Sequence, residues 1–269
     1  MIISASLRNS AGQTLSLTDD ESVYQLTNIE GLESPNNNVN IATIGMLPGG
    51  RFNGARLDTR NIVLDVVING EVETNRQALY KFCAGNITFF FQNENRNVFI
   101  DGYVDSMECN PFSQQETAQI SIICPNPFFK YITQKSEIIT NAQATSTLKN
   151  DGESPTGVEV EFEVTAAPTG LLGYISSLSL INTTTNEMLD LGGMQLVQGD
   201  KIIANTNEGE KSVKLIHNGT TSNGFQFLTS SSKFLTLASG NNAISYSVTG
   251  SNKNTVKTTV RWYDKYRGV

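Results

Sequence analysis

The chain has 269 residues and a formal net charge of -7, and only 17% of its residues are charged. This balance argues against a nucleic-acid-binding surface, because phosphate contacts need clustered Lys and Arg, and the 19 basic residues here are scattered. No stretch reaches the roughly 20 apolar residues that a membrane-spanning helix needs, and no secretory signal pattern opens the sequence. We therefore expect a soluble protein without nucleic-acid specificity and without a membrane span.

Short stretches with strand character follow one another through the first half of the chain. They are rich in β-branched and aromatic residues, and polar turns separate them. The predicted strands are 2–7, 14–17, 23–27, 62–68, 87–91, 98–104 and 118–124. This rhythm indicates an all-β fold with one interruption.

The interruption is a single predicted helix between residues 74 and 85. Thr74 with Gln77 resembles a capping box, and Gly85 fits the position after the last turn. An apolar face at helical spacing indicates that the helix packs on a sheet. The residues of that face are Ala78, Leu79, Phe82 and Cys83.

Residues 30–61 contain many residues that break regular structure, among them Pro35, Pro48 and several Gly and Asn. A segment of this length without continuous secondary structure is uncommon in a compact domain and is often functional. We expect a long excursion that contains an edge hairpin. Such an arm often serves a binding partner.

Pro125 and Pro127 end the strand at 118–124, because proline cannot donate a hydrogen bond to a sheet. The length of the chain also suits two domains at roughly 150 residues each. We therefore predict an N-terminal β-sandwich-like domain at 1–135, which carries the helix and the arm. A C-terminal antiparallel β-sandwich, galectin-like or jelly-roll-like, is predicted at 136–269.

The second half alternates regularly between apolar and polar residues. Its predicted strands lie near 158–164, 174–181, 201–205, 212–217, 225–228, 234–237, 243–249 and 256–263. In the first of these, Glu159, Glu161 and Glu163 share the face opposite to the apolar row. Paired carboxylates about 7 Å apart could suggest a glycosidase, but we favour the solvent face of an edge strand.

Other candidate sites have ordinary structural explanations that we favour. His217, the only histidine, precedes an Asn-Gly turn and is interpreted as a solvated turn residue. Asp19, Asp20 and Glu21 lack the spacing of a calcium loop and read as a polar turn. Trp262, Tyr263 and Tyr266 could stack on a sugar, although Trp262 shares a face with Val260 and Val256 and is expected in the core. No catalytic, cofactor-binding or metal-binding residue is therefore assigned.

Two further groups of residues read as structural. Cys83, Cys109 and Cys124 match no zinc or redox spacing and are predicted to be buried free thiols. The triplets at Asn86, Asn182 and Asn218 carry no weight as glycosylation sites without a secretory signal. Phe89, Phe90 and Phe91 are predicted to form a buried strand, although three consecutive aromatic residues cannot all point inward.

Several motifs, taken in order, resemble the distal tail proteins of long-tailed (siphovirus-type) phages and prophages, over nearly the whole chain. The first half contains Arg60-X-Ile-X-Leu, a helix with Arg76, Leu79 and Tyr80, and Ile-X-Ile-X-Cys-Pro-X-Pro-Phe-Phe at 120–129. The second half contains Gly-Asp-X-Ile at 199–202, Gly-X-Asn at 240–242 and a final aromatic strand with Trp262, Tyr263 and Tyr266.

This resemblance implies a non-enzymatic virion protein without a cofactor, made in the host cytoplasm and located at the tail tip. Its first domains would form a hexameric ring, with the second domains projecting outwards. The ring would join the tail-tube protein to the tail-associated protein below and, in some phages, hold the receptor-binding protein. The absence of a long insertion argues against a large side-mounted baseplate. The alternative that remains open is a module of the tail tip that binds a host-surface saccharide.

Overall fold

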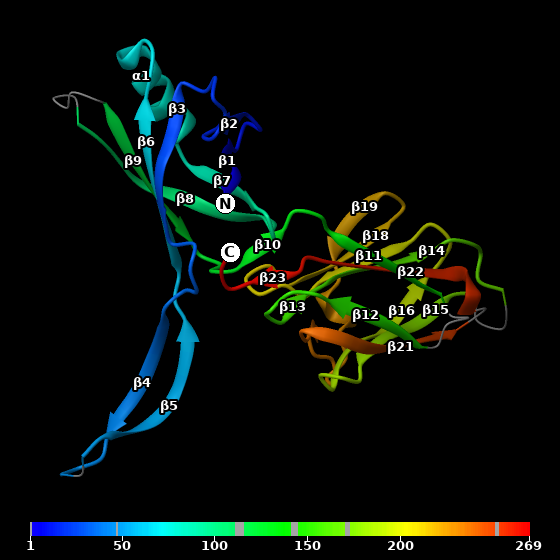
Figure 1. Cartoon of the computed structure of the whole chain (residues 1–269). Helices are drawn as coiled ribbons and strands as arrows, with labels where there is room; N and C mark the ends of the chain where they lie inside the picture. Colours follow the sequence, from blue (N-terminus) through cyan, green and yellow to red (C-terminus); the bar gives the residue numbers. More distant parts are fainter. Residues whose placement is uncertain (1, 47, 111–115, 141–144, 170–172, 251–252) are drawn as a thin grey trace. The chain divides into compact units, whose positions relative to one another are not determined.

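The computed structural model describes residues 2–46, 48–110, 116–140, 145–169, 173–250 and 253–269. These residues are nearly all in β-strands and loops, with one α-helix and two short 3-10 helices (Figure 1). The chain divides into two compact units. Unit 1 contains Met1–Ile132 and Tyr266–Val269, and unit 2 contains Thr133–Lys265. The all-β class predicted from the sequence is confirmed.

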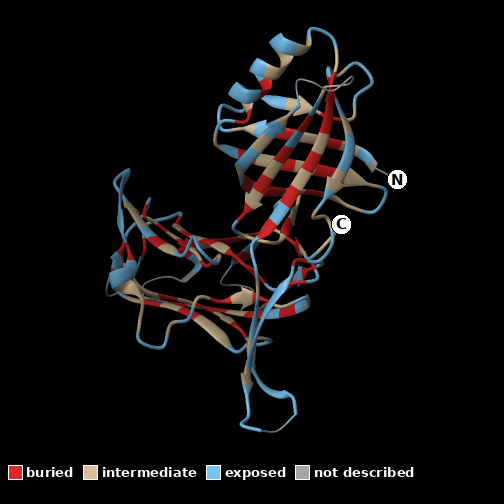
Figure 2. Cartoon of the chain, turned by 90° about the vertical axis from the view of Figure 1, so that its left-hand side faces the viewer, coloured by how far each residue is buried: buried red, intermediate tan, exposed pale blue. Residues whose placement is uncertain are grey.

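Unit 1 is built on one antiparallel sheet that curls so that some of its strands cross over others (Figure 2). The strand order is β2-β1-β7-β8-β9-β6-β3, with β10 paired to β8 and β23 paired to β10. The predicted sandwich-like domain is thus one curled sheet instead of two separate sheets. Its strands are β1 (Ile2–Asn9), β2 (Thr14–Ser16), β3 (Tyr24–Glu30), β6 (Arg60–Ile68), β7 (Asn86–Asn93), β8 (Asn97–Cys109), β9 (Thr117–Cys124), β10 (Phe129–Tyr131) and β23 (Lys265–Tyr266).

The core of unit 1 lies on the inner face of this sheet, where alternate residues of β6, β7 and β9 are buried. Ile62, Leu64 and Val66 of β6 are fully buried, as are Ile120 and Ile122 of β9. Burial of a side chain of this size contributes roughly 1.5–3 kcal/mol. The alternation also fixes the register, because a slip by one residue would turn this apolar row toward solvent.

Helix α1 (Val72–Phe82) packs against the same core. Leu79 and Cys83 are buried, and they lie one helical turn apart. The hydroxyl of Tyr24 donates a hydrogen bond of 2.8 Å to the carbonyl of Asn75 and so joins the helix to β3. The predicted helix that packs on a sheet is therefore present.

The ends of the helix differ in part from the prediction. The helix begins before Thr74, and its N-cap residue Glu71 makes no side-chain capping hydrogen bond, so the predicted capping box is wrong. Ala78 is exposed and does not belong to the buried face. Gly85 follows the helix with a φ of 108°, a conformation that favours glycine. The predicted position of this glycine is confirmed.

A separate two-stranded sheet projects from unit 1 (Figure 1). It consists of β4 (Asn37–Thr43) and β5 (Gly50–Leu57) and is called the arm below. The hairpin expected within residues 30–61 is thus confirmed.

Unit 2 is a sandwich of two antiparallel sheets with an apolar core between them. One sheet has the order β11-β22-β14-β17-β18-β19, and the other has the order β12-β21-β15-β16. The strands of the first are β11 (Lys135–Thr140), β14 (Glu159–Val164), β17 (Lys201–Asn205), β18 (Ser212–His217), β19 (Thr220–Asn223) and β22 (Val256–Trp262). Those of the second are β12 (Thr145–Asn150), β15 (Ile175–Asn182), β16 (Glu187–Leu196) and β21 (Gly240–Gly250).

Short elements complete unit 2 and correct one expectation. The strand predicted near 225–228 is wrong, because Phe225–Phe227 form a 3-10 helix. Two short strands, β13 (Thr156–Gly157) and β20 (Thr236–Leu237), form a separate two-stranded sheet. A second 3-10 helix, Lys253–Thr255, precedes β22.

The predicted β-sandwich character of the second half is present. The last four residues belong to unit 1, whereas the sequence placed them in the second domain.

Candidate assembly surfaces

The arm is an amphipathic ribbon, because residues opposite each other across the two strands share a face. Val39 lies opposite Ala55, and Ile41 lies opposite Phe52, which makes one face apolar. The opposite face carries Asn38 with Arg56, and Ala42 with Arg51. Both faces are open to solvent in the monomer.

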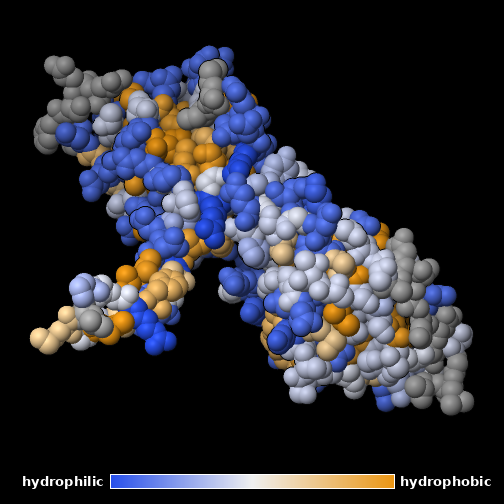
Figure 3. Space-filling view, turned by 60° about the horizontal axis from the view of Figure 1, so that its bottom comes forward, coloured by the Kyte–Doolittle hydropathy of each residue, from blue (hydrophilic) through white to orange (hydrophobic). Residues whose placement is uncertain are grey.

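The apolar face of the arm is exposed to an unusual degree. The exposed fractions of Val39, Ile41 and Phe52 are 46%, 60% and 64%. Figure 3 shows apolar surface along this projecting hairpin. An isolated two-stranded hairpin is at best marginally stable in water, and a large exposed apolar surface is typical of an interaction site. The arm is therefore a candidate surface for binding another polypeptide.

The curled sheet of unit 1 brings its two ends close together. The amide of Leu26 in β3 donates a hydrogen bond of 2.8 Å to the carbonyl of Leu17, and the amide of Leu17 donates one of 2.9 Å to the carbonyl of Ala5 in β1. Residue 17 thereby bridges β1 and β3. Both of these strands lie at or next to an end of the sheet order.

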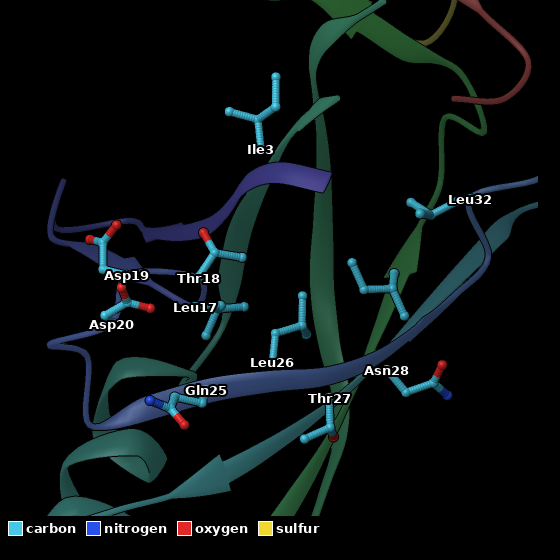
Figure 4. A pocket seen from close by; sticks show the side chains of 11 residues that line it. Ile3, Leu17, Thr18, Asp19, Asp20, Gln25, Leu26, Thr27, Asn28 and Leu32 are labelled. Atoms are coloured by element: carbon cyan, nitrogen blue, oxygen red, sulfur yellow. The ribbon is translucent and has the colours of Figure 1, made fainter. Parts of the chain in front are cut away.

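A groove of about 630 Å³ opens between β1 and β3 next to this bridge. In Figure 4, Leu26 points into the gap, Asp19 and Asp20 lie at one end, and Leu32 lies at the other. Ile3 contributes from β1. Among the described residues that line the groove none is basic. The lining mixes apolar and polar side chains, and Asp19 and Asp20 make one end acidic. We call this feature the β1–β3 groove.

Arg60 fixes the base of the arm. Its buried guanidinium donates hydrogen bonds to the carbonyls of Gly31 and Glu33, which lead into the arm, and to that of Arg267. The guanidinium also lies over the ring of Phe129, at 4.5 Å from the centroid. Burial lowers the pKa of Arg60, against a raising effect of the Cys124 and Glu33 side chains. An arginine nevertheless remains charged at neutral pH.

A second arginine holds the C-terminal segment against the same region of unit 1. Arg96 donates a hydrogen bond to the carbonyl of Gly268 and lies over the ring of Tyr266, at 4.4 Å from its centroid. The amide of Val269 donates a hydrogen bond of 3.1 Å to the carbonyl of Leu32. Residues 266–269 thus contact the segment from which the arm departs.

The remaining candidate polar sites belong to unit 2, except for Asp19 and Asp20. His217 ends β18, half exposed, and its Nδ1 lies 2.8 Å from Oδ1 of Asp200. It precedes a turn in which Asn218 and Gly219 both have positive φ, so its interpretation as a turn residue is confirmed. Asp19 and Asp20 lie in a turn, at the groove. No group of three or more potential metal-ligating side chains occurs within the described ranges.

The three glutamates of β14 form a charge ladder with the neighbouring strands. Arg261 contacts Glu159 at 3.1 Å and Glu161 at 2.8 Å, and Lys201 contacts Glu161 at 3.1 Å and Glu163 at 3.0 Å. The expectation of an edge strand is wrong, because β14 lies between β22 and β17. Its carboxylates are paired with cations across the sheet instead of deterring aggregation at an edge.

The aromatic candidates do not form a common surface. Trp262 belongs to the core of unit 2 and is 5% exposed, as predicted, so it offers no platform for a sugar. Phe89 and Phe91 are buried in unit 1. Phe90 points to the other face, where it packs against Phe99 and under the guanidinium of Arg8. The prediction that these three aromatic residues cannot share one face is confirmed.

The three cysteines are free, as predicted, but the predicted burial holds only for Cys83 and Cys124. Burial raises the pKa of the Cys83 thiol to about 12 and that of the Cys124 thiol to about 12, and Cys109 is half-buried. No helix within the described ranges is long and apolar enough to cross a membrane.

No protein-family model matches the chain, and no curated protein matches its sequence. Solved structures do match. The crystal structure of the Dit protein (gp 19.1) of phage SPP1, described as a paradigm of the hub adsorption apparatus in phages that infect Gram-positive bacteria, has a TM-score of 0.72 and 14% identity. The match covers 97% of this chain and 98% of that one.

Two structures of the phage P2 baseplate in its activated conformation also match nearly end to end. The one with Ca has a TM-score of 0.56 at 12% identity, and covers 99% of each chain. The one with Sr has a TM-score of 0.53 at 11% identity, and covers 96% of this chain and 97% of that one. The chain therefore shares its fold with phage hub and baseplate proteins.

Proposed function

We propose that this chain is a non-enzymatic structural protein of a phage tail, which forms a hub at the distal end of the tail. The observation that carries this proposal is the likeness to the SPP1 Dit protein over nearly the full length of both chains, at a TM-score of 0.72. The SPP1 protein is itself described as a hub of an adsorption apparatus. A match of both units in one chain is more specific than a match of a single β-sandwich, which serves many functions.

We infer a closed ring, a hexamer, as the assembled state, with residues 1–135 as the ring-forming part and residues 136–269 outside the ring contacts. The exposed apolar face of the arm supports self-association, since such a surface is costly to leave in water. Identical subunits that meet through two different surfaces form a ring when the rotation closes. In this hexamer, unit 1 of each of the six copies would lie around one common axis.

In this proposal the ring contacts the tail-tube protein on one side and the tail-associated protein on the other, and a receptor-binding protein attaches in some tails. The protein acts in the virion tail tip after synthesis in the host cytoplasm. Its role is mechanical: it joins parts and requires no cofactor. The net charge of -7 suits this role, because a DNA passage lined by such subunits would not retain DNA.

The test is the mass of the purified chain over a wide range of concentrations, by light scattering after size separation, followed by negative-stain imaging. A six-subunit ring with an open centre supports the proposal. The same measurement is repeated after mixing with the tail-tube protein, because some assemblies form only with their partners. A chain that remains monomeric under all of these conditions contradicts the proposed hub.

A further inference from the structure

We propose that the arm of one copy binds in the β1–β3 groove of a second copy. This inference rests on the proposed self-assembly and adds the two surfaces that meet. The arm and the groove both belong to unit 1, and both are open to solvent in a single copy. Each has a composition that complements the other.

Both the arm and the groove expose apolar side chains that could pack against each other. The arm offers Ile41 and Phe52 side by side on one face, and both are more than half exposed. The groove offers Leu26, Ile29 and Leu32 along its length. Burying these side chains against each other removes apolar surface of both partners from water, at about 25 cal/mol per Å². In Figure 3 apolar surface is visible both on the arm and on the main body of unit 1.

The charges are opposite. Residues 37–57 contain Arg51 and Arg56 and no Asp, Glu or Lys. The groove has Asp19 and Asp20 at one end and no described basic residue in its lining. Opposite charges on two surfaces speed their encounter and fix their orientation more than they raise affinity. The two arginines lie on the polar face of the ribbon, so they attract the acidic groove at long range, while the apolar face makes the contact with the groove.

The outer edge of β3 can also pair with an added strand. β3 is the terminal strand of its sheet, and beyond residue 26 no described strand pairs with its outer edge. An extended segment can add to such an edge by main-chain hydrogen bonds, with side chains entering alternate positions. Each arm strand of about eight residues spans roughly 26 Å and could pair with the outer edge of β3 beyond residue 26.

The contact joins two different surfaces, so it is heterologous. Each copy gives one arm and receives one, and the series closes into a ring if the rotation between copies allows it. A reciprocal exchange between two copies would give a dimer with the same contact. The proposal thus predicts the contact in any oligomer of this chain, and the ring size is a separate question.

Cross-linking tests the contact directly. Chains with Ile41→Cys are mixed with mass-tagged chains that carry Ile3→Cys, both in a Cys109→Ser background, and are treated with a mild disulfide-forming oxidant. The expected result is a disulfide between one chain of each type. The matched control replaces Ile41→Cys with Asn40→Cys, which lies next to it on the other face of the ribbon and should cross-link far less.

Self-association provides an independent readout. Phe52→Ser should weaken association about tenfold or more, as expected for loss of a central aromatic anchor, whereas Asn40→Ser should leave it unchanged. Both positions are exposed, so the unfolding midpoint of each variant should equal that of the original chain. The Asp19→Asn, Asp20→Asn double variant should show a smaller decrease of association with added salt.

The outcomes separate this inference from the proposed function. Rings that form normally with Phe52→Ser and give no arm-to-groove disulfide overturn the inference and leave the hub intact. A groove that cross-links only to a tail-tube or tail-associated protein also overturns it. A disulfide-linked dimer without rings supports the contact and contradicts the hexamer. A chain that neither associates nor cross-links contradicts both.

Discussion

Arg60 Nε donates a hydrogen bond of 2.8 Å to the carbonyl oxygen of Pro127, which joins the start of β6 to the segment that follows β9. The other nitrogens of the same guanidinium bind the carbonyls of Gly31, Glu33 and Arg267. One side chain thus ties together three segments that are far apart in the sequence. Gly31 takes a φ of 87° and leaves no space for a Cβ, which would lie 2.0 Å from the carbonyl oxygen of Asn61.

Arg60→Met should destabilise unit 1 by about 3 kcal/mol or more, because it leaves four part-buried carbonyls without this donor. Arg60→Lys should also be destabilising, since one ammonium group cannot reproduce the planar fork. The measurement is urea unfolding followed by circular dichroism. The control is Arg56→Ala on the exposed arm, with an expected change within about 0.5 kcal/mol. Equal stability of Arg60→Met and the original chain would contradict this role.

The thiols should respond to alkylation according to burial. The pKa values of Cys83 and Cys124 are raised to about 12 by burial, so both remain protonated and unreactive at pH 8. We expect iodoacetamide to label the native chain once, at the half-buried Cys109, and the unfolded chain three times, as counted by mass spectrometry. Two or three labels on the native chain would contradict the packing around these cysteines.

The same two thiols also make a prediction about stability at high pH. Their pKa values are higher in the folded chain than the ordinary value of 9.0, so the folded state holds its protons longer than the unfolded state. The free energy of unfolding should be unaffected by these groups below pH 9 and should fall between pH 9 and about 12. Cys124→Ala should reduce this slope, although it also removes some packing.

The fold was largely predictable because it depends on local patterns. Alternation along β6, β9 and β14 revealed which face is buried, since a strand side chain points to alternate faces. The helix was detected from Leu79 and Cys83, one turn apart, whereas its start was misplaced at Thr74. The segment 225–228 was misread because three apolar residues with short spacing suit a strand and a 3-10 turn equally.

The candidate surfaces were much less predictable. The sequence indicated an arm within residues 30–61 from its Gly, Pro and Asn content, but not which face would be apolar, since this depends on the pairing of Ile41 with Phe52. The β1–β3 groove depends on the curl of the whole sheet. Arg60 was noticed only as part of a motif, because its carbonyl partners are separated from it by up to 207 positions.

Glu161 should contribute to the stability of unit 2 through the charge ladder. Burial opposes its charge, but hydrogen bonds from Arg261 and Lys201 outweigh this effect, so its pKa is below the ordinary 4.5. Its contribution is therefore present above pH 4.5 and is lost as the pH falls through the lowered pKa. Glu161→Gln should cost about 1 kcal/mol at pH 7, and the difference should shrink below pH 4.5.

Glu163→Gln is the matched control for this prediction, measured by urea unfolding at several pH values. Glu163 contacts Lys201 alone in the ladder and is more exposed, 31% against 16%. Its replacement should cost less than that of Glu161. If both variants lose the same free energy at every pH, the ladder is only a solvated surface.

Asn242 gives the sharpest prediction for unit 2, because all its hydrogen-bonding groups are used inside the protein. Its Nδ2 donates to the carbonyls of Ala238 and Gly240 at 2.8 and 3.0 Å. Its Oδ1 accepts hydrogen bonds from the amide of Ala238 at 2.9 Å and from Nδ2 of Asn182 at 3.0 Å. The side chain is fully buried. It therefore determines the path of the loop that enters β21.

Asn242→Asp keeps the size of the side chain but replaces a donor by a charged acceptor that faces two carbonyl oxygens. We expect a loss of about 3 kcal/mol or more at pH 7, because an unpaired buried charge and two unsatisfied carbonyls are both costly. Asn241→Asp, the same chemical change at the exposed neighbouring residue, should change the free energy of unfolding by less than about 0.5 kcal/mol. Both are measured by urea unfolding. Similar losses in the two variants would show that the amide of Asn242 does not hold this loop.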